Sequence, residues 1–251
     1  MRNFFTLIII LLSTSYLHSQ IDDPNVFRRD LTFQDELTFG AKLSTNGWGL
    51  DIRRGYFIDT KHKYFFEGGF NVIHHPKEYK QASVHILFRN FVYGKLNECY
   101  DLKFGYGRQY VLYEKKDIGS VEVRIIASGG ADIAILKPIY YIIRYNNMTE
   151  TSKYVVSMQP ATIERKARFS KGLDETKFDP GIYLKLGTSF EHSKTEKALS
   201  ILEFGIEGYF FMNNLEIMAE TNNSRLVTSL FISYRFGSLR ENHHKKNDLD
   251  L

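Results

Sequence analysis

Residues 226–236, LVTSLFISYRF, contain the pattern that decides the fold. Apolar side chains recur at even-numbered positions, namely Leu226, Leu230, Ile232, Tyr234 and Phe236. Ser229, Ser233 and Arg235 fall between them. Because successive side chains of a strand point to opposite faces, this spacing predicts a strand with one apolar and one polar face.

The same alternation recurs from one end of the chain to the other. It is clear in residues 31–44, 48–58, 64–72, 102–112, 121–128, 182–191 and 202–210. Residues 84–93 alternate only briefly. Within residues 132–145, the runs 133–136 and 139–143 are apolar on both faces, with Pro138 between them, where a strand usually breaks or bulges. The pattern predicts an all-β, antiparallel up-and-down barrel of ten strands, with eight strands as the alternative.

Strand length and aromatic placement favour a barrel that crosses a membrane. The segments have ~10–14 residues, longer than the ~5–6 usual in globular proteins and long enough to cross a bilayer at a tilt. Aromatic residues such as Trp48, Tyr56 and Tyr110 gather towards segment ends, as interfacial girdles do. The ending Tyr234-Arg235-Phe236 resembles the C-terminal signature of outer-membrane barrels. A soluble lipocalin-like barrel or a β-sandwich is the alternative.

The ends of the chain differ from its centre. Arg2, the apolar run 4–12 and the polar stretch 13–20 have the layout of a secretory signal peptide, predicted as residues 1–19. We expect a periplasmic segment at 20–30, the barrel at 31–238 and a disordered polar tail at 239–251. No other apolar run is long enough for a spanning helix, so a membrane form must be a closed barrel.

The connections predict an orientation. An even number of strands places both termini on one side, which is the periplasm in outer-membrane barrels, with long loops outside. Asn146–Asp179 is predicted as one long polar loop and Asn213–Arg225 as a shorter one. Asp59–Lys63 and His192–Ala198 are the candidate periplasmic turns.

Charged residues on the polar face are the candidate functional set. They are Glu36, Lys42, Asp51, Arg53, Glu67, Lys103, Glu122, Arg124, Lys185, Glu203, Glu207 and Arg235. The interior of an eight- to ten-stranded barrel is filled by side chains, and buried ions must pair there. We therefore predict a lumen plugged by ion pairs. A proton or ion path and a catalytic acid–base pair are the alternatives, and a wide pore would need about sixteen strands.

Other residue patterns carry no specific chemistry. The net charge of +4, with acids and bases interleaved, does not indicate nucleic-acid binding. His74-His75 would point to opposite faces of a strand, and His243-His244 lies in the tail. Cys99 is single and forms no internal disulfide. There is no G-x-S-x-G motif, so we predict no catalytic residues, metal site or cofactor, and no enzyme.

Several short motifs are similar to those of an outer-membrane β-barrel family of the Bacteroidota. They are residues 93–97 (YGKLN), 102–109 (LKFGYGRQ), 121–124 (VEVR), 128–130 (SGG), 136–138 (LKP), 169–173 (FSKGL) and 180–185 (PGIYLK). The resemblance implies a barrel in the outer membrane. It transfers no catalytic residues, and it associates such barrels with accessory roles beside β-barrel assembly or protein-export machinery.

These observations predict a structural or accessory subunit of a larger outer-membrane assembly. Its expected partners are outer-membrane lipid, lipopolysaccharide and other outer-membrane proteins. A small channel for a solute or ion is the first alternative. A lipid- or peptide-modifying enzyme of the outer membrane is the second.

Overall fold

Eight antiparallel strands form a closed barrel in the computed structural model, which describes residues 33–82, 90–115, 120–145, 148–156, 158–192 and 198–241. The strands are β1 (Phe33–Ser44), β2 (Gly47–Phe57), β3 (His62–Ile73), β6 (Asn97–Tyr113), β7 (Glu122–Pro138), β11 (Lys177–Glu191), β12 (Ala198–Phe211) and β13 (Leu226–Glu241). Each pairs with its neighbour in the chain order of these eight, and β13 pairs with β1 to close the sheet.

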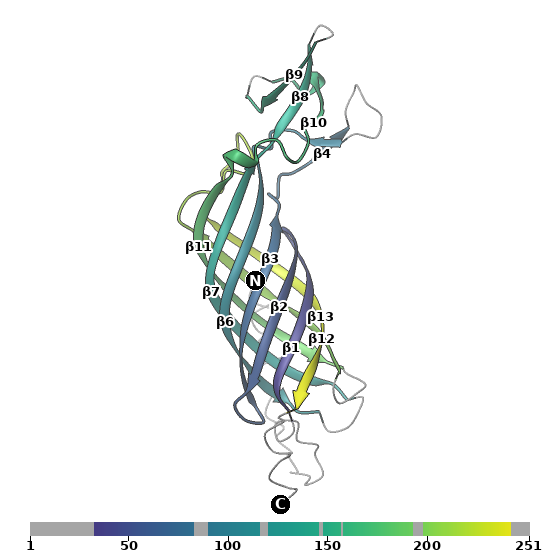
Figure 1. The fold of residues 1–251 in the computed structure, drawn as a ribbon, viewed down its shortest axis with the longest axis vertical. Coiled ribbons are helices and arrows are strands. Elements are labelled where there is room, and N and C mark those ends of the chain that lie inside the picture. The colour runs from purple at the N-terminus through teal and green to yellow at the C-terminus, as the bar shows by residue number, and fades with distance from the viewer. Residues whose placement is uncertain are drawn as a thin grey trace, which may run out of the picture.

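The two ends of the barrel have different connections (Figure 1). At the end where β1 begins and β13 finishes, the strands are joined by residues 58–61, 114–121 and 192–197. We call this the turn end. At the opposite, loop end the connections are residues 45–46, 74–96, 139–176 and 212–225. This asymmetry agrees with the turns and the long loop predicted from the sequence.

The prediction of ten strands is wrong, because both additional segments leave the barrel. Pro138 is the last residue of β7, and β8 (Tyr140–Tyr145) pairs with β9 (Met148–Lys153) and β10 (Ile163–Lys166) instead of with a barrel strand. Within 84–93, the described part contains β5 (Asn90–Val92), which pairs with β4 (Lys80–Ala82). Apolar residues of both segments pack in a second hydrophobic core outside the barrel.

This second core belongs to a folded module at the loop end, which Figure 1 shows projecting beyond the barrel. The module comprises the sheet β10-β8-β9, the hairpin β4-β5 and the 3-10 turns η1 (Pro160–Thr162) and η2 (Leu173–Glu175). Its buried hydrophobic residues are Phe91, Ile139, Tyr141, Tyr154 and Ile163. The segment Asn146–Asp179, predicted as one polar loop, therefore contains strands, and its last residues lie in β11.

The connection 212–225 folds over the barrel as an apolar lid. Leu215, Ile217 and Met218 are buried against inward-facing residues of β3, β6, β7, β11 and β12. The backbone N–H of Leu96 donates to Ile217 at 2.9 Å, and that of Ala219 donates to Gly94 at 2.7 Å. The lid is thus attached to the connection 74–96 and closes the loop end of the barrel.

The polarity of the barrel wall is the reverse of that of a water-soluble protein. In β2, Asp51 and Arg53 are 6% and 1% exposed, whereas Leu50 and Ile52 are 54% and 45% exposed. Outward apolar side chains continue around the barrel, including Phe39, Leu102, Phe104, Ile182, Leu184, Phe204, Ile206, Leu230, Ile232 and Phe236. No helix in the described part of the chain has the length and apolar character needed to cross a membrane.

The domain boundaries are described only in part. Residues 1–32 and 242–251 lie outside the described residues, so the signal peptide, the segment 20–30 and most of the tail remain predictions. β13 continues through Glu241, past the expected boundary at 238. Leu239 is buried with Leu199 and Ile201, and this contact extends the strand.

Candidate functional site

All twelve charged residues predicted to face the lumen are buried inside the barrel. They occupy alternate positions on adjacent strands, so the closed sheet directs all of them inward. Lys63 and Glu191 are buried with them, at 3% and 0% exposure. In the described chain, these fourteen residues are seven cations and seven carboxylates, arranged in two layers along the barrel.

The layer nearest the turn end consists of Glu36, Lys63, Glu122, Arg124 and Glu191. Arg124 is its centre: Nε lies 2.5 Å from Glu122 Oε1, one terminal nitrogen contacts Glu191, and the other lies 3.7 Å from Glu36. Lys63 Nζ lies 3.3 Å from Glu36 Oε2. Three carboxylates therefore share two cations in this layer.

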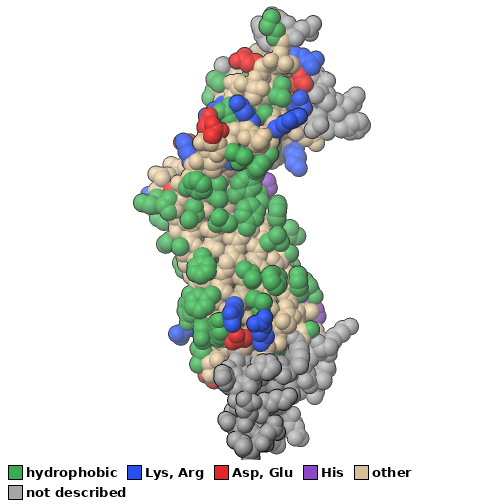
Figure 2. Space-filling view, viewed as in Figure 1, with side chains coloured by type: hydrophobic (Ala, Val, Ile, Leu, Met, Phe, Trp, Pro, Cys, Tyr) green, Lys and Arg blue, Asp and Glu red, His purple; other side chains and the backbone are tan. Residues whose placement is uncertain are grey.

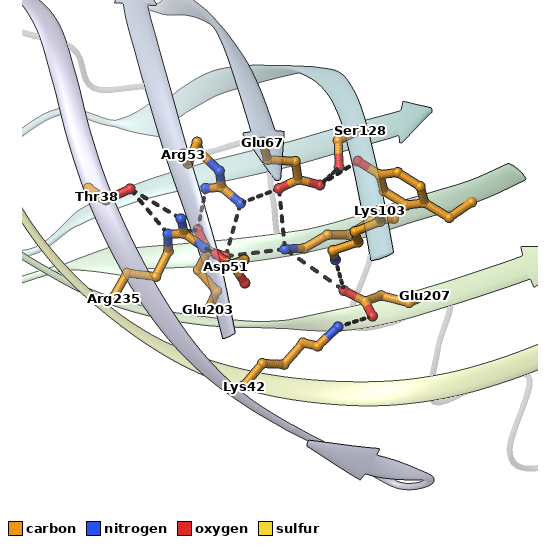
Figure 3. Close-up of polar contacts among 12 residues, drawn as sticks. Thr38, Lys42, Asp51, Arg53, Glu67, Lys103, Ser128, Glu203, Glu207 and Arg235 are labelled. Carbon is orange, nitrogen blue, oxygen red and sulfur yellow. Dashed lines mark hydrogen bonds and ion pairs between the residues drawn. The ribbon is translucent and has the colours of Figure 1, made fainter. Parts of the chain in front are cut away.

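The central layer contains Lys42, Asp51, Arg53, Glu67, Lys103, Lys185, Glu203, Glu207 and Arg235, most of which are labelled in Figure 3. Arg53 lies 2.6 Å from Glu203 and 3.1 Å from Glu67, and so joins β12 to β3 across the lumen. Arg235 contacts Asp51 and lies 3.8 Å from Glu203. Both arginines therefore lie within ion-pair distance of the same oxygen, Glu203 Oε1.

Three lysines surround Glu207 in the central layer. Lys42, Lys103 and Lys185 lie 2.5, 3.2 and 3.9 Å from its carboxylate oxygens. Tyr209 donates to the same carboxylate at 2.5 Å. Five cations and four carboxylates make up the layer, so its charge is nearly balanced and complements the excess of carboxylates in the turn-end layer.

Neutral groups complete the central layer. The hydroxyls of Ser128 and Tyr183 donate to Glu67 Oε1 at 2.7 and 2.9 Å, and Arg235 donates to Thr38 at 3.2 and 3.4 Å. Removing an ion from water costs several kcal/mol, and ion pairs with additional hydrogen bonds offset that cost. The contacts therefore form one connected network that fills the barrel cross-section.

Two aspartates lie between the central layer and the lid. Asp101 accepts a hydrogen bond from Asn71 at 2.5 Å. Asp132 is 1% exposed, and within the described residues neither of its carboxylate oxygens has a hydrogen-bond donor. In the strand register Asp132 is the partner of Lys103, the nearest cation along the sheet.

Some charged residues of the lumen were absent from the predicted set, although their positions in the strands would have identified them. Glu191 and Asp101 have the same strand parity as Lys185 and Lys103. Lys63 shares its parity with Glu67, but it stands at the start of β3, where it was expected in a turn. Ranking polar residues by strand parity alone would have found these three and also Asp132, which shares its parity with Arg124.

The histidine pair lies in the loop-end connection 74–96. His74 Nδ1 is 3.2 Å from Glu78 Oε2, and Lys95 Nζ is 2.7 Å from the same oxygen. Burial raises the pKa of Glu78, but hydrogen bonds from His74, Lys95 and the backbone N–H of His75 outweigh it and hold this pKa at about 2. The described residues contain no cluster of three His, Cys, Asp or Glu side chains that could ligate a metal ion.

Comparisons with known proteins find similar solved structures but no related sequence. No protein-family model matches the chain, and no curated protein matches it in sequence. Among solved structures, Neisserial surface protein A (NspA) is 9% identical with a TM-score of 0.40, over 82% of this chain and 96% of that one. The N-terminal β-barrel domain of Pseudomonas aeruginosa OprF is 9% identical with a TM-score of 0.36, over 83% and 99%.

The attachment invasion locus protein Ail of Yersinia pestis is 8% identical with a TM-score of 0.40, over 83% of this chain and 99% of that one. Similarities of this size assign neither a family nor a function. The eight-stranded barrel rests on its own strand pairing, and its chemistry rests on the buried charges.

Proposed function

We propose that this chain is an outer-membrane β-barrel with a sealed lumen that serves as an accessory subunit of a larger outer-membrane assembly. The observation that carries the proposal is the reversed polarity of the wall. The fourteen ions of the two layers are buried and face inward, while outward apolar side chains from Phe39 on β1 to Phe236 on β13 are exposed. A monomer in water rarely exposes a continuous apolar surface of this extent, whereas lipid requires one.

The orientation follows from the same features. In outer-membrane barrels short turns face the periplasm and long loops face outward. The turn end would therefore be periplasmic, and the folded module would project from the outer surface. An exported chain whose motifs resemble those of a Bacteroidota barrel family fits this placement.

A sealed lumen makes a transport role secondary. The two ion-pair layers cross the barrel interior, and the lid of Leu215, Ile217 and Met218 covers the loop end. An ion crossing the barrel would have to break several buried pairs in succession, each of which is costly to separate. The part of the molecule left to act on its surroundings is the outer wall together with the module.

The module is the element we assign to partner binding. It has its own buried core, and Tyr141 Oη lies 2.8 and 2.9 Å from the carbonyl oxygens of Val92 and Lys95, which ties β8 to the connection 74–96. Every residue of β9 is exposed or partly exposed. Among the described residues β9 is an edge strand of the sheet β10-β8-β9, and a stable module with such an edge suits docking of another protein by strand pairing or side-chain contact. By the family resemblance, that protein would belong to barrel-assembly or export machinery.

The test is purification of the tagged chain from native outer membranes in mild detergent, followed by mass spectrometry of bound proteins. In the matched variant, residues 139–176 are replaced by a short Asn-Gly turn. Lys177 pairs with Leu136, so the ends of β7 and β11 are adjacent and a short loop can join them. We expect stoichiometric companions with the full chain and their loss from the variant.

Heat-modifiable electrophoretic migration of the variant is the control for a folded barrel. A full chain that purifies from the outer membrane without any companion would overturn the accessory role. A full chain that does not fractionate with the outer membrane would overturn the proposed location.

A further inference from the structure

The outer wall contains an apolar groove of about 560 Å³ over β1, β2, β3 and β6. Phe39, Leu50, Ile52, Phe70 and Leu102 form its sides, and the backbone at Gly68 and Gly69 forms its floor. Figure 2 shows this side of the barrel, where apolar side chains lie above and below a central band that has few of them. The groove has the volume of a small-ligand pocket (~300–1,000 Å³) but lies in the surface that would face lipid.

Gly68 creates the groove because an outward side chain is missing at this position. A Cβ atom built there would lie 3.9 Å from the side chains of Ile52 and Phe104, in ordinary contact. The position could therefore carry a side chain without a clash. The floor is a site where a chain from outside can approach the backbone closely.

A polar rim borders the groove on its turn-end side. Arg54 follows Ile52 on the outward face of β2, ~7 Å farther along the strand. Its guanidinium lies 2.8 Å from Asp35, and both side chains are partly exposed, at 54% and 26%. Arg108 on β6 is exposed and donates to Tyr106 Oη at 3.2 Å. Among the described residues no carboxylate pairs with Arg108, so the described part of the rim carries one positive charge without an ion-pair partner.

The rim and the groove lie on neighbouring residues of the same strands. Arg54 pairs in register with Phe66, and Gly68 is the next outward position on β3. Arg108 pairs with Tyr64, the outward position before Phe66. The exposed cation and the empty apolar groove are therefore separated by only a few residues of strand, roughly 7–13 Å.

We propose that the groove binds one acyl chain of an anionic phospholipid, in preference to a zwitterionic one, and that the phosphodiester of this lipid contacts Arg108 and Arg54. This inference rests on the proposed insertion into a membrane. In a phospholipid the phosphate is followed by an apolar chain. The distance between the two matches the distance between the cations of the rim and the groove. The single negative charge of the lipid balances the unpaired charge of the rim. The lipid belongs to the leaflet at the turn end, with its chain directed towards the loop end.

Selectivity comes from fit and charge. Inside a bilayer every lipid tail is apolar, so association there depends on close packing at small residues and on polar contacts. A bulky side chain at residue 68 would remove the fit, and loss of the Arg108 charge would remove the contact with the phosphate. After either change, the lipids that occupy the groove should have the same composition as the surrounding bilayer.

Trp48, the single tryptophan of the chain, provides the measurement. It precedes Leu50 on the outward face of β2, and its ring centroid lies 6.5 Å from that of Phe70, which lines the groove. The experiment reconstitutes the full chain into phosphatidylcholine vesicles that contain a small fraction of phosphatidylglycerol with brominated chains. Bromine quenches tryptophan fluorescence on contact, so quenching reports occupancy of the groove.

We expect several-fold stronger quenching than the mole fraction of brominated lipid would give, and no such excess with brominated diacylglycerol, which lacks the phosphate. G68L and R108Q should each abolish the excess. The matched control is G208L on β12, another lipid-facing glycine, where a Cβ would meet nothing within 4 Å. This variant should keep the wild-type excess.

Quenching of the wild type in proportion to the mole fraction of brominated lipid would overturn the proposal. Loss of the excess quenching in G208L to the same extent as in G68L would also overturn it. A photo-crosslinking residue in place of Leu50 that labels a protein instead of lipid in native membranes would overturn it as well. Failure of the chain to enter vesicles, detected by flotation, would instead contradict the proposed membrane insertion. The two failures are therefore distinguishable.

Discussion

At the scale of single residues, Glu207 is a lumen carboxylate with three cation partners. Its carboxylate is the shared partner of Lys42, Lys103 and Lys185. Substitution by Gln keeps the volume but leaves three buried ammonium groups without this anion. Breaking a buried pair from one side costs ~3–5 kcal/mol. We expect Glu207→Gln to lower the free energy of unfolding by about this amount, measured in urea through Trp48 fluorescence of vesicle-bound protein.

The control for this prediction is Glu175→Gln. Lys153 and Glu175 also form an ion pair, but their side chains are 51% and 39% exposed. Exposed pairs contribute ~1 kcal/mol or less. Equal unfolding midpoints for the two variants would mean that the lumen pairs do not stabilise the barrel.

Gly105 tests how tightly the lumen is filled. A Cβ atom at this position would lie 2.1 Å from Tyr183 Oη and 2.6 Å from the carbonyl oxygen of Gly129. Overpacking of this kind costs ~1–3 kcal/mol. Gly105→Ala should therefore reduce the heat-modifiable folded fraction, whereas Gly208→Ala, which meets no atom within 4 Å, should not. A Gly105→Ala barrel as stable as the wild type would indicate a lumen with free space.

Strand parity predicted the lumen residues because each inward position is fixed by the closure of the sheet. It predicted burial for all twelve candidates, from Glu36 on β1 to Arg235 on β13. It could not predict which ions pair. Arg53 and Glu203 are 150 residues apart in sequence and meet only because β2 and β12 face each other across the lumen.

At the scale of elements, the connection 74–96 contains a carboxyl group, that of Glu78, whose pKa is strongly depressed. The pKa of Glu78 is about 2 in the folded protein, below its usual value of ~4.3. A depressed carboxyl pKa contributes stability at pH values above ~4.3, and that contribution is lost as the pH falls towards 2. We expect cleavage of this connection by an acid protease to increase across that interval.

The Glu78→Gln substitution should remove the pH dependence of this cleavage, so that the protease cuts the connection readily at every pH between ~4.3 and ~2. Glu150→Gln, a substitution at an exposed position of β9, should retain the wild-type profile. A Glu78→Gln profile that matches the wild type would show that the contacts with His74 and Lys95 do not hold this connection.

Element boundaries explain why the sequence predicted two strands too many. Residues 133–136 and 139–143 are apolar on both faces because the first run ends a barrel strand and the second begins the segment that supplies Ile139 and Tyr141 to the core of the module. The periodicity of a segment predicts that one of its faces is apolar, but it does not predict which core that face packs against. Only the pairing of β8 with β9 and β10, rather than with β11, shows where the barrel strand stops.

At the scale of the whole molecule, two closed cores share one chain. The barrel is closed by strand pairing and filled by ions, whereas the module is held by aromatic and aliphatic packing around Tyr141 and Ile163. The sequence predicted the first core, since alternation is a local signal. The second core and the lid depend on contacts between connections far apart in sequence, such as Lys95 with Met218, and no local pattern encodes them.

The central claim is a membrane barrel whose lumen does not conduct. Its most direct test is electrical recording from planar bilayers in concentrated potassium chloride, with insertion of the chain verified independently by protease protection. The ion-pair layers and the lid predict a baseline without stepwise currents over a wide voltage range. Regular, reproducible conductance steps from inserted wild-type protein would contradict the sealed lumen and would make a small channel the leading function.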